Sequence, residues 1–491
     1  MNRDEAAMNE IKIVLVCSDY RGNDVFKSAS LPVGLGYLAR SLEVNGIAYD
    51  VVDLNLDSVD YLFSKLRDIC PSYLGISMMS YRYKRTYDLL YDIKDIFPKM
   101  HIIAGGPHVT ANRQKVMQDC KAIDFGVIGE GEFALIELIE GSTPASVLGI
   151  FYREGGDIQF SGERKFISNL DKVPFPTYQG FRLEMYGESM RLASSRGCPY
   201  KCIYCGAPKL LGKKWRNKTA QGMLAEFDYW YDKGWRSFNF NDSNFAINKK
   251  RVKAFCEEII KRNINVSFVA EGVRVDQVDY ELLKLMRRAG FTSIVFGVES
   301  GSNSVLRNLK KGETSQQSDS AIAAATNLDF NVTLFFLIGS PGESEEDVKK
   351  SFALALKYNV ARVYFFNLTP IPGTEFYDWA VEHGFWTGGD DLYPEENFGF
   401  SSKALFQTDA MTLDQITGCL KKARHIERQV RVSFALQKFL WLIIRKNITL
   451  KRNVNGWFLN LTWLLSFRKA MPIYTSLSRV AKIFFVHFFV K

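Results

Sequence analysis

Short apolar runs alternate with longer amphipathic stretches along the first third of the chain. Five runs rich in Val and Ile are each followed by enough chain for one helix, and they lie at residues 11–18, 49–55, 73–79, 101–106 and 125–130. Parallel strands buried on both faces have this nearly continuous apolar character. The pattern predicts an α/β domain with a doubly wound, Rossmann-like parallel sheet, whose ligands would lie beyond the carboxyl ends of the strands.

A second series of strand-like runs follows a hairpin-like stretch at 149–160 and a proline-containing link at 171–180. Stretches with helical periodicity separate its six runs, which lie at residues 191–197, 236–242, 266–272, 292–300, 332–341 and 362–368. Six βα units favour a partial, (β/α)6 TIM-like barrel with its chemistry at the carboxyl ends of the strands. Beyond Gly399 the strand pattern stops, and residues 411–446 are predicted to be helical.

These patterns divide the 491 residues into four expected segments. The first domain is expected at 1–160, a linker at 161–190, the barrel at 191–400 and a basic, aromatic-rich helical C-terminal region at 401–491. The N-terminal residues offer no apolar core after a basic start, so a secretory signal is not expected. Eight cysteines in a chain of this length are too few for a disulfide framework, which favours a cytoplasmic protein.

Charge is unevenly distributed along the chain. The net charge is +9, yet residues 421–491 contain fifteen Lys and Arg and one acid, Glu427. A basic tail beside a mildly acidic body excludes a protein that coats nucleic acid along its whole length, and no nucleic-acid recognition fold accompanies the tail.

The tail contains apolar runs at 439–444, 457–467 and 483–490, none of which reaches the roughly 18 residues that a spanning helix needs. Two interpretations stay open. The tail is either an interfacial segment attracted to anionic lipid, which would place the protein peripherally on the inner face of a membrane, or a helical cap that packs on the barrel.

Three cysteines, Cys198, Cys202 and Cys205, follow the first predicted barrel strand with spacings of four and three residues. Three thiolates on one loop can bind three corners of a cuboidal 4Fe-4S cluster and leave the fourth iron without a protein ligand. A structural zinc would need a fourth ligand, and Cys256 and Cys419 stand alone in the sequence. We therefore expect these three residues to be metal ligands.

This cysteine spacing after the first barrel strand resembles the radical S-adenosylmethionine superfamily. The additional N-terminal domain resembles the cobalamin-dependent class of that superfamily, and the resemblance covers roughly residues 10–400. It implies that the open iron chelates S-adenosylmethionine, which is cleaved reductively to a 5′-deoxyadenosyl radical. It also implies an external one-electron reductant of the flavodoxin or ferredoxin type.

The resemblance also implies cofactor contacts at the carboxyl ends of the barrel strands. Asp242 is the candidate for the methionyl amino group, although the family often has a second acid where Asn241 stands; the alternative is that Asp242 only caps the strand end. The remaining candidates are Tyr204 as a shield of the cluster, Glu299 and Ser300 at the ribose, and Gly339 and Pro341 at the adenine.

Three loops of the first domain resemble cobalamin-binding loops, in which small residues let the corrin ring approach the strand ends. The candidate contacts are Leu35, Gly36, Gly106, Pro107, His108, Gly129 and Glu130. The D-x-H-x-x-G motif that supplies an axial histidine in many cobalamin proteins is absent, so cobalamin is expected to bind without histidine ligation. A doubly wound domain with glycine turns could also hold a nucleotide or no ligand.

The resemblance implies methylation of an unactivated carbon, with a small or lipid-like molecule as the substrate. Two alternatives stay open. Some members of the family carry out oxidative cyclisation or rearrangement with the same cofactors, and a protein of a different class, a cobalamin or iron–sulfur sensor, would catalyse nothing.

Overall fold

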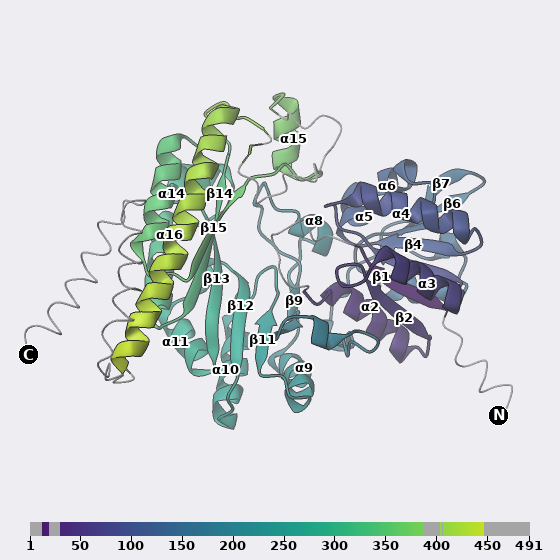
Figure 1. Ribbon diagram of the computed structural model, residues 1–491, viewed down its shortest axis with the longest axis horizontal. Helices are drawn as coiled ribbons and strands as arrows, with labels where there is room; N and C mark the ends of the chain where they lie inside the picture. Colours follow the sequence, from purple (N-terminus) through teal and green to yellow (C-terminus); the bar gives the residue numbers. More distant parts are fainter. Residues whose placement is uncertain (1–11, 19–29, 386–402, 405, 446–491) are drawn as a thin grey trace, which may run out of the picture. The chain divides into compact units, whose positions relative to one another are not determined.

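The computed structural model (Figure 1) describes residues 12–18, 30–385, 403–404 and 406–445. The chain divides into two compact units, residues 1–434 and 435–491, and every site discussed below lies in the first unit.

The first domain is built on a seven-stranded sheet with the order β2-β1-β3-β4-β5-β6-β7. Its strands are β1 (Ile13–Cys17), β2 (Tyr49–Asp53), β3 (Tyr73–Ser77), β4 (His101–Gly105), β5 (Phe125–Val127), β6 (Ile150–Glu154) and β7 (Asp157–Phe160). Its helices are α2 (Val33–Val44), α3 (Val59–Ile69), α4 (Tyr83–Ile96), α5 (Pro107–Asn112), α6 (Gln114–Asp119) and α7 (Glu132–Ile139). The first five strands are parallel, which confirms the doubly wound prediction.

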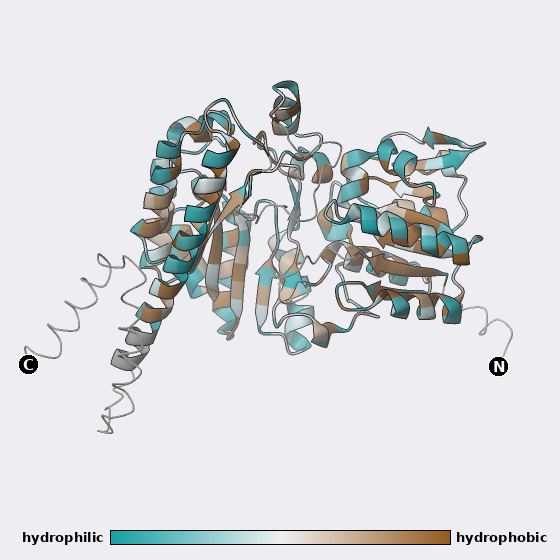
Figure 2. Cartoon of the chain, turned by 45° about the horizontal axis from the view of Figure 1, so that its top comes forward, coloured by the Kyte–Doolittle hydropathy of each residue, from teal (hydrophilic) through white to brown (hydrophobic). Residues whose placement is uncertain are grey.

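Alternate side chains of β1 belong to different hydrophobic cores. Ile13 and Leu15 pack with residues of α2 and α7, whereas Val14 and Val16 pack with residues of α3 and α4 on the other face of the sheet. Because both faces are covered, the strand must be apolar at every position, and the run that predicted it has this pattern. Figure 2 shows the result as hydrophobic strands between helices that are hydrophilic on one side.

The hairpin-like stretch at 149–160 does form a hairpin, and it belongs to the first domain. β6 pairs antiparallel with β5, so the hairpin extends the first sheet from five strands to seven. Between Phe160 and Met190 the chain has no strand, and it contains the short 3-10 turns Leu170–Lys172 and Leu183–Met185.

The second sheet has six parallel strands in the order β15-β14-β13-β12-β11-β8, as a partial TIM-like barrel requires. These are β8 (Met190–Leu192), β11 (Ser237–Phe240), β12 (Ser267–Val273), β13 (Phe291–Glu299), β14 (Asn331–Ile338) and β15 (Arg362–Asn367). The helices of this domain are α8 (Ala207–Leu211), α9 (Ala220–Asp232), α10 (Lys249–Arg262), α11 (Tyr280–Arg288), α12 (Asn303–Asn308), α13 (Ser315–Asn327), α14 (Glu345–Lys357) and α15 (Glu375–Glu382).

The strand predicted at 191–197 is divided into two. After Leu192 the chain leaves the barrel sheet, and Ser195–Arg196 (β9) pairs antiparallel with Arg216–Asn217 (β10). The buried Asp242 carboxylate accepts hydrogen bonds from the backbone N–H groups of Ser194 and Ser195, at 2.7 and 2.8 Å. These bonds hold the backbone of Ser194 and Ser195 in a turn, so these two residues do not pair with the strands of the barrel sheet.

A 33-residue helix, α16 (Leu413–Arg445), confirms the helical prediction for 411–446. It protects the edge strand β15: the Glu427 carboxylate accepts from the Phe365 N–H at 2.8 Å, and Arg424 donates to the Phe365 carbonyl at 2.7 Å. Unpaired edge-strand groups would otherwise be open to pairing with another chain. Within the described ranges, no helix is long and apolar enough to span a membrane. The apolar runs at 457–467 and 483–490 lie outside those ranges.

Candidate functional site

The cysteine loop begins at a backbone conformation that only glycine adopts easily. Gly197 has φ +84°, and a Cβ at this position would lie 2.3 Å from the carbonyl oxygen of Lys214. The next residue, Cys198, donates its N–H to the Gly212 carbonyl at 3.1 Å. The antiparallel pair β9–β10 and this turn therefore hold the start of the loop.

The middle of the loop is anchored by the buried Ile203. Its N–H donates to the Leu309 carbonyl at 3.1 Å, and its carbonyl accepts from the Phe376 N–H at 3.0 Å. Its side chain packs with both of these residues. Because Ile203 stands between Cys202 and Cys205, the anchor holds both of these cysteines in place.

All three cysteines of the loop are half-buried and form no disulfide. Burial, together with the neighbouring Cys202 and Cys198 thiols, raises the pKa of Cys205 to about 11. In the part of the chain that the structure describes, no three His, Cys, Asp or Glu side chains are arranged around one metal ion. A cuboidal cluster binds its cysteines at separate corners, so a cluster on this loop would not require the three thiols to meet at one metal ion.

Buried charges surround the loop on the barrel side. Arg274 follows β12, and its guanidinium lies 3.7 Å from the centre of the Tyr200 ring, within the cysteine loop. The Tyr200 hydroxyl accepts a hydrogen bond of 2.7 Å from Gln277. Arg274 also pairs with Asp276 at 3.0 Å and with Glu313 at 3.3 Å.

Lys311 is the second buried cation of this group, 2.9 Å from the Glu299 carboxylate and 3.7 Å from Glu313. Burial raises the pKa of the Cys202 thiol, while the charges of Lys311 and Arg274 oppose that rise. Cations near a cysteine favour its thiolate form, which is the form that binds metal. These charges therefore suit a loop of metal-binding thiolates.

Three of the predicted cofactor contacts of the barrel, Glu299, Tyr204 and Asn241, lie beside the cysteine loop or the cavity. Glu299, with φ +65°, lies in the charge group beside the loop, and burial together with the Glu299 charge raises the pKa of Tyr204. Asn241 lines the cavity described below. Tyr204 belongs to the apolar group around Ile203.

The other barrel candidates, Asp242, Ser300, Gly339 and Pro341, do not line the cavity. Asp242 is buried against Ser194 and Ser195, the strand-end role that was its alternative. The Ser300 hydroxyl accepts from the Ser302 N–H at 3.2 Å. At Gly339 a Cβ would lie 2.9 Å from the Phe406 ring, so the absence of a side chain there makes room for Phe406. The Pro341 carbonyl accepts from Asn308.

A cavity of about 300 Å³ opens at the carboxyl ends of β1, β3, β4 and β5. Its barrel side is lined by Ala193, Ser195, Arg196, Leu210, Leu211, Asn241 and Ser243. The strand order reverses between β1 and β3, and this is the point at which doubly wound sheets bind their ligands. The cavity is thus lined both by the loops expected to bind cobalamin and by Ser195 and Arg196, just before Cys198.

Five of the predicted cobalamin contacts line this cavity: Leu35, Gly106, Pro107, Gly129 and Glu130. Gly106 has φ +91°, and a Cβ there would lie 2.9 Å from the Met78 nitrogen. Gly36 does not line the cavity, since a Cβ there would lie 2.5 Å from the Tyr178 ring. A wall of glycines and apolar side chains fits a bulky, flat ligand that must approach the strand ends closely.

His108 does not line the cavity either. It is buried, its Nε2 lies 3.0 Å from the Tyr87 hydroxyl and its Nδ1 lies 3.2 Å from the Ser80 hydroxyl. Burial lowers the pKa of His108 to about 4. Both ring nitrogens of His108 therefore lie against side chains of the protein.

An ion network between the two domains was not foreseen from the sequence. Arg196 and Arg216, which are paired residues of β9 and β10, each lie 2.8 Å from Glu130, and Arg196 also lies 2.7 Å from Glu132. The Arg196 guanidinium stacks 4.6 Å from the centre of the Tyr37 ring. Sequence spacing contains no signal for it, because the partners are far apart in the chain.

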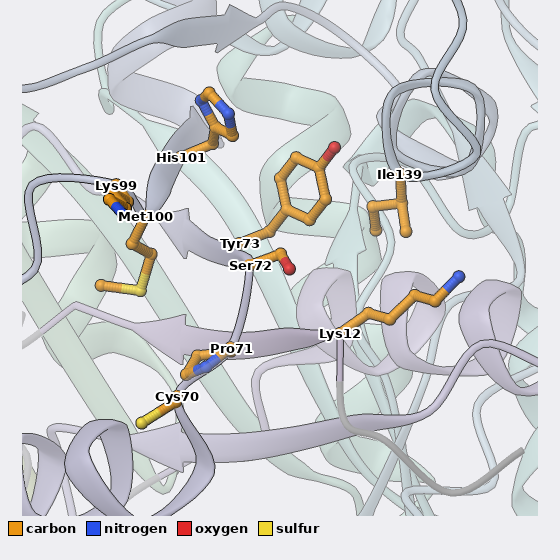
Figure 3. A pocket seen from close by; sticks show the side chains of 9 residues that line it. All are labelled: Lys12, Cys70, Pro71, Ser72, Tyr73, Lys99, Met100, His101 and Ile139. Atoms are coloured by element: carbon orange, nitrogen blue, oxygen red, sulfur yellow. The ribbon is translucent and has the colours of Figure 1, made fainter. Parts of the chain in front are cut away.

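A second pocket, of about 560 Å³, opens at the opposite end of the first sheet, near the amino ends of β1, β3 and β4 (Figure 3). It is lined by Lys12, Cys70, Pro71, Ser72, Tyr73, Lys99, Met100, His101 and Ile139. No predicted site residue belongs to it. The predicted site residues of the first domain that line a cavity therefore lie at the carboxyl end of its sheet.

Comparisons with known proteins agree with this arrangement. The family model described as "Radical SAM superfamily" matches residues 192–355, and the one described as "B12 binding domain" matches residues 23–139. The uncharacterized methyltransferase PH0819 of Pyrococcus horikoshii is 30% identical over 389 residues, which cover 76% of this chain and 84% of that protein.

Two further relatives extend the picture. The anaerobic magnesium-protoporphyrin IX monomethyl ester cyclase of Cereibacter sphaeroides is 25% identical, over 75% of this chain and 63% of its own. The solved structure of the radical S-adenosylmethionine methyltransferase TsrM from Kitasatospora setae, with tryptophan and an S-adenosylmethionine analogue, has a TM-score of 0.65 at 19% identity and covers 76% of each chain. It shows the same fold.

The two matched domains, the cysteine loop within the second of them and the similarity to PH0819 over most of both chains lead to one assignment. The chain belongs to the cobalamin-dependent radical S-adenosylmethionine enzymes.

Proposed function

We propose that this protein methylates an unactivated carbon of a small or lipid-like substrate. One observation carries the proposal: the cavity at the glycine loops is also lined by Ser195 and Arg196, three and two residues before Cys198. The expected sites of a methyl carrier and of a radical generator are thus adjacent. Named methyltransferases such as PH0819 among the relatives support methyl transfer as the reaction.

When bound, the cofactors supply the hard chemistry: the iron–sulfur cluster provides the electron that cleaves S-adenosylmethionine to the 5′-deoxyadenosyl radical, and methylcobalamin provides the methyl group. The protein's residues bind and orient these groups. Cys198, Cys202 and Cys205 would each hold one iron of the cluster. The positive charges of Lys311 and Arg274 favour the thiolate form of Cys202.

For S-adenosylmethionine, we assign the polar contacts at the carboxyl end of β11 to Asn241 and Ser243, which line the cavity. Asp242 instead holds the Ser194–Ser195 turn. Glu299 remains the candidate for the ribose, because its pair with Lys311 places a carboxylate beside the cysteine loop.

For cobalamin, the ligand contacts are Leu35, Gly106, Pro107, Gly129 and Glu130. His108 is left out of these proposed contacts, because its ring nitrogens lie within hydrogen-bond distance of Tyr87 and Ser80, and cobalamin would then be held without a histidine of this loop.

A second reaction, oxidative cyclisation, is kept because a relative 25% identical over 75% of this chain is named a cyclase. Both reactions need an external one-electron reductant. A peripheral membrane contact through the basic tail remains part of the proposal and concerns residues beyond those described.

The test is anaerobic reconstitution with iron, sulfide and hydroxocobalamin, followed by assay of 5′-deoxyadenosine with a strong reductant. Wild type should form it, and Cys198→Ala, Cys202→Ala and Cys205→Ala should not. Cys70→Ala is the matched control, because Cys70 is exposed and outside the loop.

Product analysis then separates the reactions. A methylated product with S-adenosylhomocysteine supports methyl transfer, whereas an unmethylated ring or rearranged product supports cyclisation. An iron–sulfur spectrum without cleavage of S-adenosylmethionine under any reductant contradicts both and favours a sensor.

A further inference from the structure

Side chains of the first three barrel strands, β8, β11 and β12, alternate between two environments. One set is buried in the core together with residues of α9 and α10, as are Leu192, Phe240 and Ala270. The alternate set points to the inner face of the sheet, away from these helices, and is half-buried. The inner face therefore keeps accessible surface at these strands.

Three polar side chains are neighbours on this inner face. Arg191 on β8 pairs in register with Asn239 on β11. On the next strand, β12, the Glu271 carboxylate accepts a hydrogen bond of 2.7 Å from the Asn239 amide. All three residues are half-buried. We call Arg191, Asn239 and Glu271 the polar triad.

The two charges of the polar triad have no counterion in the described part of the chain. Arg191 makes no hydrogen bond or ion pair with any described residue, and the Glu271 carboxylate accepts only from the neutral Asn239 amide there. The Asn239 amide oxygen is buried and has no hydrogen-bond donor among the same residues. Partly buried charges and amide oxygens without partners cost free energy, so a ligand that supplied those partners would be bound favourably.

The polar triad adjoins the cavity between the glycine loops and the barrel. Ala193 and Asn241 stand two residues beyond Arg191 and Asn239, and both line that cavity. The Asn241 N–H donates to the Leu192 carbonyl at 2.9 Å, so the pairing of β8 with β11 continues to the cavity. A ligand on the polar triad would thus lie next to the cavity in which methyl transfer is proposed.

We propose that the polar triad binds an amino-acid group of the substrate, with the substrate carboxylate at Arg191 and the substrate ammonium at Glu271 and the Asn239 oxygen. The substrate is then an amino acid or a molecule that carries one. The inference rests on the proposed function for the reaction and adds the class of substrate.

The chemistry of the polar triad favours a ligand with both charges. A guanidinium binds a carboxylate through two parallel N–H···O bonds, and an ammonium donates to carboxylate and amide oxygens. A ligand with a carboxylate alone would leave Glu271 without a cation. One strand separates β8 from β12, so these strands lie about 10 Å apart, and a group with both charges on one carbon fits between side chains that reach from each.

The experiment compares three probes with the same six-carbon chain. Norleucine carries both charges, hexanoate only the carboxylate and hexylamine only the ammonium. Binding is measured by isothermal titration to the full-length protein reconstituted with iron, sulfide and hydroxocobalamin, with saturating S-adenosylmethionine and no reductant. S-adenosylmethionine is included because an open iron could bind the amino acid itself. We expect wild type to bind norleucine roughly tenfold or more tightly than either other probe, the effect of one hydrogen bond to a charged group.

Two variants assign the charges to their side chains. Arg191→Gln should remove the advantage of norleucine over hexylamine, and Glu271→Gln should remove its advantage over hexanoate, while the glutamine oxygen can still accept from Asn239. The matched controls are Arg288→Gln and Glu281→Gln, which remove a cation and an acid from exposed positions of α11 and should leave norleucine binding unchanged.

A second measurement is the urea midpoint of unfolding without any probe. Because neither charge of the polar triad has a counterion to lose, Arg191→Gln and Glu271→Gln should keep or raise the wild-type midpoint. A clear decrease in either variant, relative to its control on α11, would show that the charge stabilises the fold and would overturn the proposed site.

The binding outcomes are equally decisive. Equal or tighter binding of hexanoate or hexylamine by wild type, or no binding of norleucine, overturns the amino-acid class. That comparison uses wild type alone, so it holds even if a variant fails to fold. Unchanged norleucine binding in folded Arg191→Gln and Glu271→Gln overturns the polar triad as its site.

The outcome is independent of the proposed reaction. If norleucine binds at the polar triad but 5′-deoxyadenosine is never formed, the proposed function fails and the amino-acid site stands. If 5′-deoxyadenosine forms but norleucine does not bind, the reaction class stands and the amino-acid site fails.

Discussion

Arg196 lies 2.8 Å from Glu130, and this buried ion pair connects the β9 strand that precedes the cysteine loop to a glycine loop of the cobalamin-binding domain. Arg216 shares the same carboxylate from the neighbouring strand β10. Both arginines and Glu130 are almost fully buried, so solvent screens these pairs little. These ion pairs thus connect the Glu130 loop of the first domain to the strand pair β9–β10 beside the cysteine loop.

Glu130→Gln should destabilise the protein by about 3 to 5 kcal/mol, because it leaves two buried arginines without their shared carboxylate. The free energy of unfolding by urea measures this directly. The control is Glu346→Gln, whose partner Lys349 is solvent-exposed, and it should leave stability unchanged. Equal stability of the two variants would contradict the network's role.

Gly197→Ala should abolish assembly of the iron–sulfur cluster. The added Cβ would lie 2.3 Å from the Lys214 carbonyl at a φ of +84°, so the backbone before Cys198 must move. Iron content and the visible spectrum after anaerobic reconstitution measure the effect. Gly187→Ala is the control, since nothing lies within 4 Å of its Cβ position, and it should keep wild-type iron content.

Asn241→Ala should weaken ligand binding, whereas Asp242→Asn should lower the stability of the fold. Asn241 lines the cavity, so its loss should weaken S-adenosylmethionine binding, by about fivefold to tenfold for one hydrogen bond of 1 to 1.5 kcal/mol. Asp242 accepts from Ser194 and Ser195, so Asp242→Asn should instead lower the unfolding free energy by about 1 to 3 kcal/mol. The same binding loss in both variants at equal stability would refute the distinction.

Glu343 should make stability fall as the pH rises. Burial raises the pKa of this carboxyl from 4.5 to about 8, so the folded protein binds a proton that the unfolded chain releases. The unfolding free energy should therefore decrease between about pH 4.5 and pH 8, with a contribution on the order of 5 kcal/mol at most. Urea titrations at several pH values measure this.

Glu343→Gln is the variant that isolates this contribution. A neutral amide oxygen can still accept from the N–H groups of Gly339 and Ser340, as the Glu343 carboxyl does at 2.8 and 3.1 Å. The variant should lose the decrease in stability between pH 4.5 and pH 8. An unchanged pH dependence would show that Glu343 does not titrate as inferred.

Glu427→Ala should expose the edge strand β15. The N–H of Phe365 loses its acceptor and Arg424 loses its partner, so unfolding should become easier by about 1 to 3 kcal/mol and the Phe365 amide should exchange with solvent faster. Hydrogen exchange measured by mass spectrometry follows this amide. The control is Asp414→Ala in the same helix, which makes no ion pair among the described residues and should leave β15 protected.

Much of the architecture was predictable from local pattern. The five parallel strands of the first domain and the six of the barrel follow from short apolar runs, because a strand covered on both faces must be apolar throughout. The cysteine loop was predictable from spacing alone. The hairpin β6–β7 was recognised, but its pairing with β5 was not, because a hairpin's own sequence does not specify which edge it joins.

Individual site residues were less predictable. Asn241 and Asp242 are adjacent at one strand end, and only the backbone direction decides that the first lines the cavity while the second turns to Ser194. His108 follows a glycine loop, yet Tyr87 and Ser80 hold it away from the cavity.

The sequence by itself determined the two α/β domains and the spacing of the three cysteines in the loop, because periodicity and short motifs act between near neighbours in the chain. The tertiary structure alone decided which charges meet. Arg196 reaches Glu130 across 66 residues, and Lys311 reaches Glu299 only because the chain after β13 turns back to the strand end. Such contacts depend on how the strands and loops pack together, and no local pattern encodes a partner that far away.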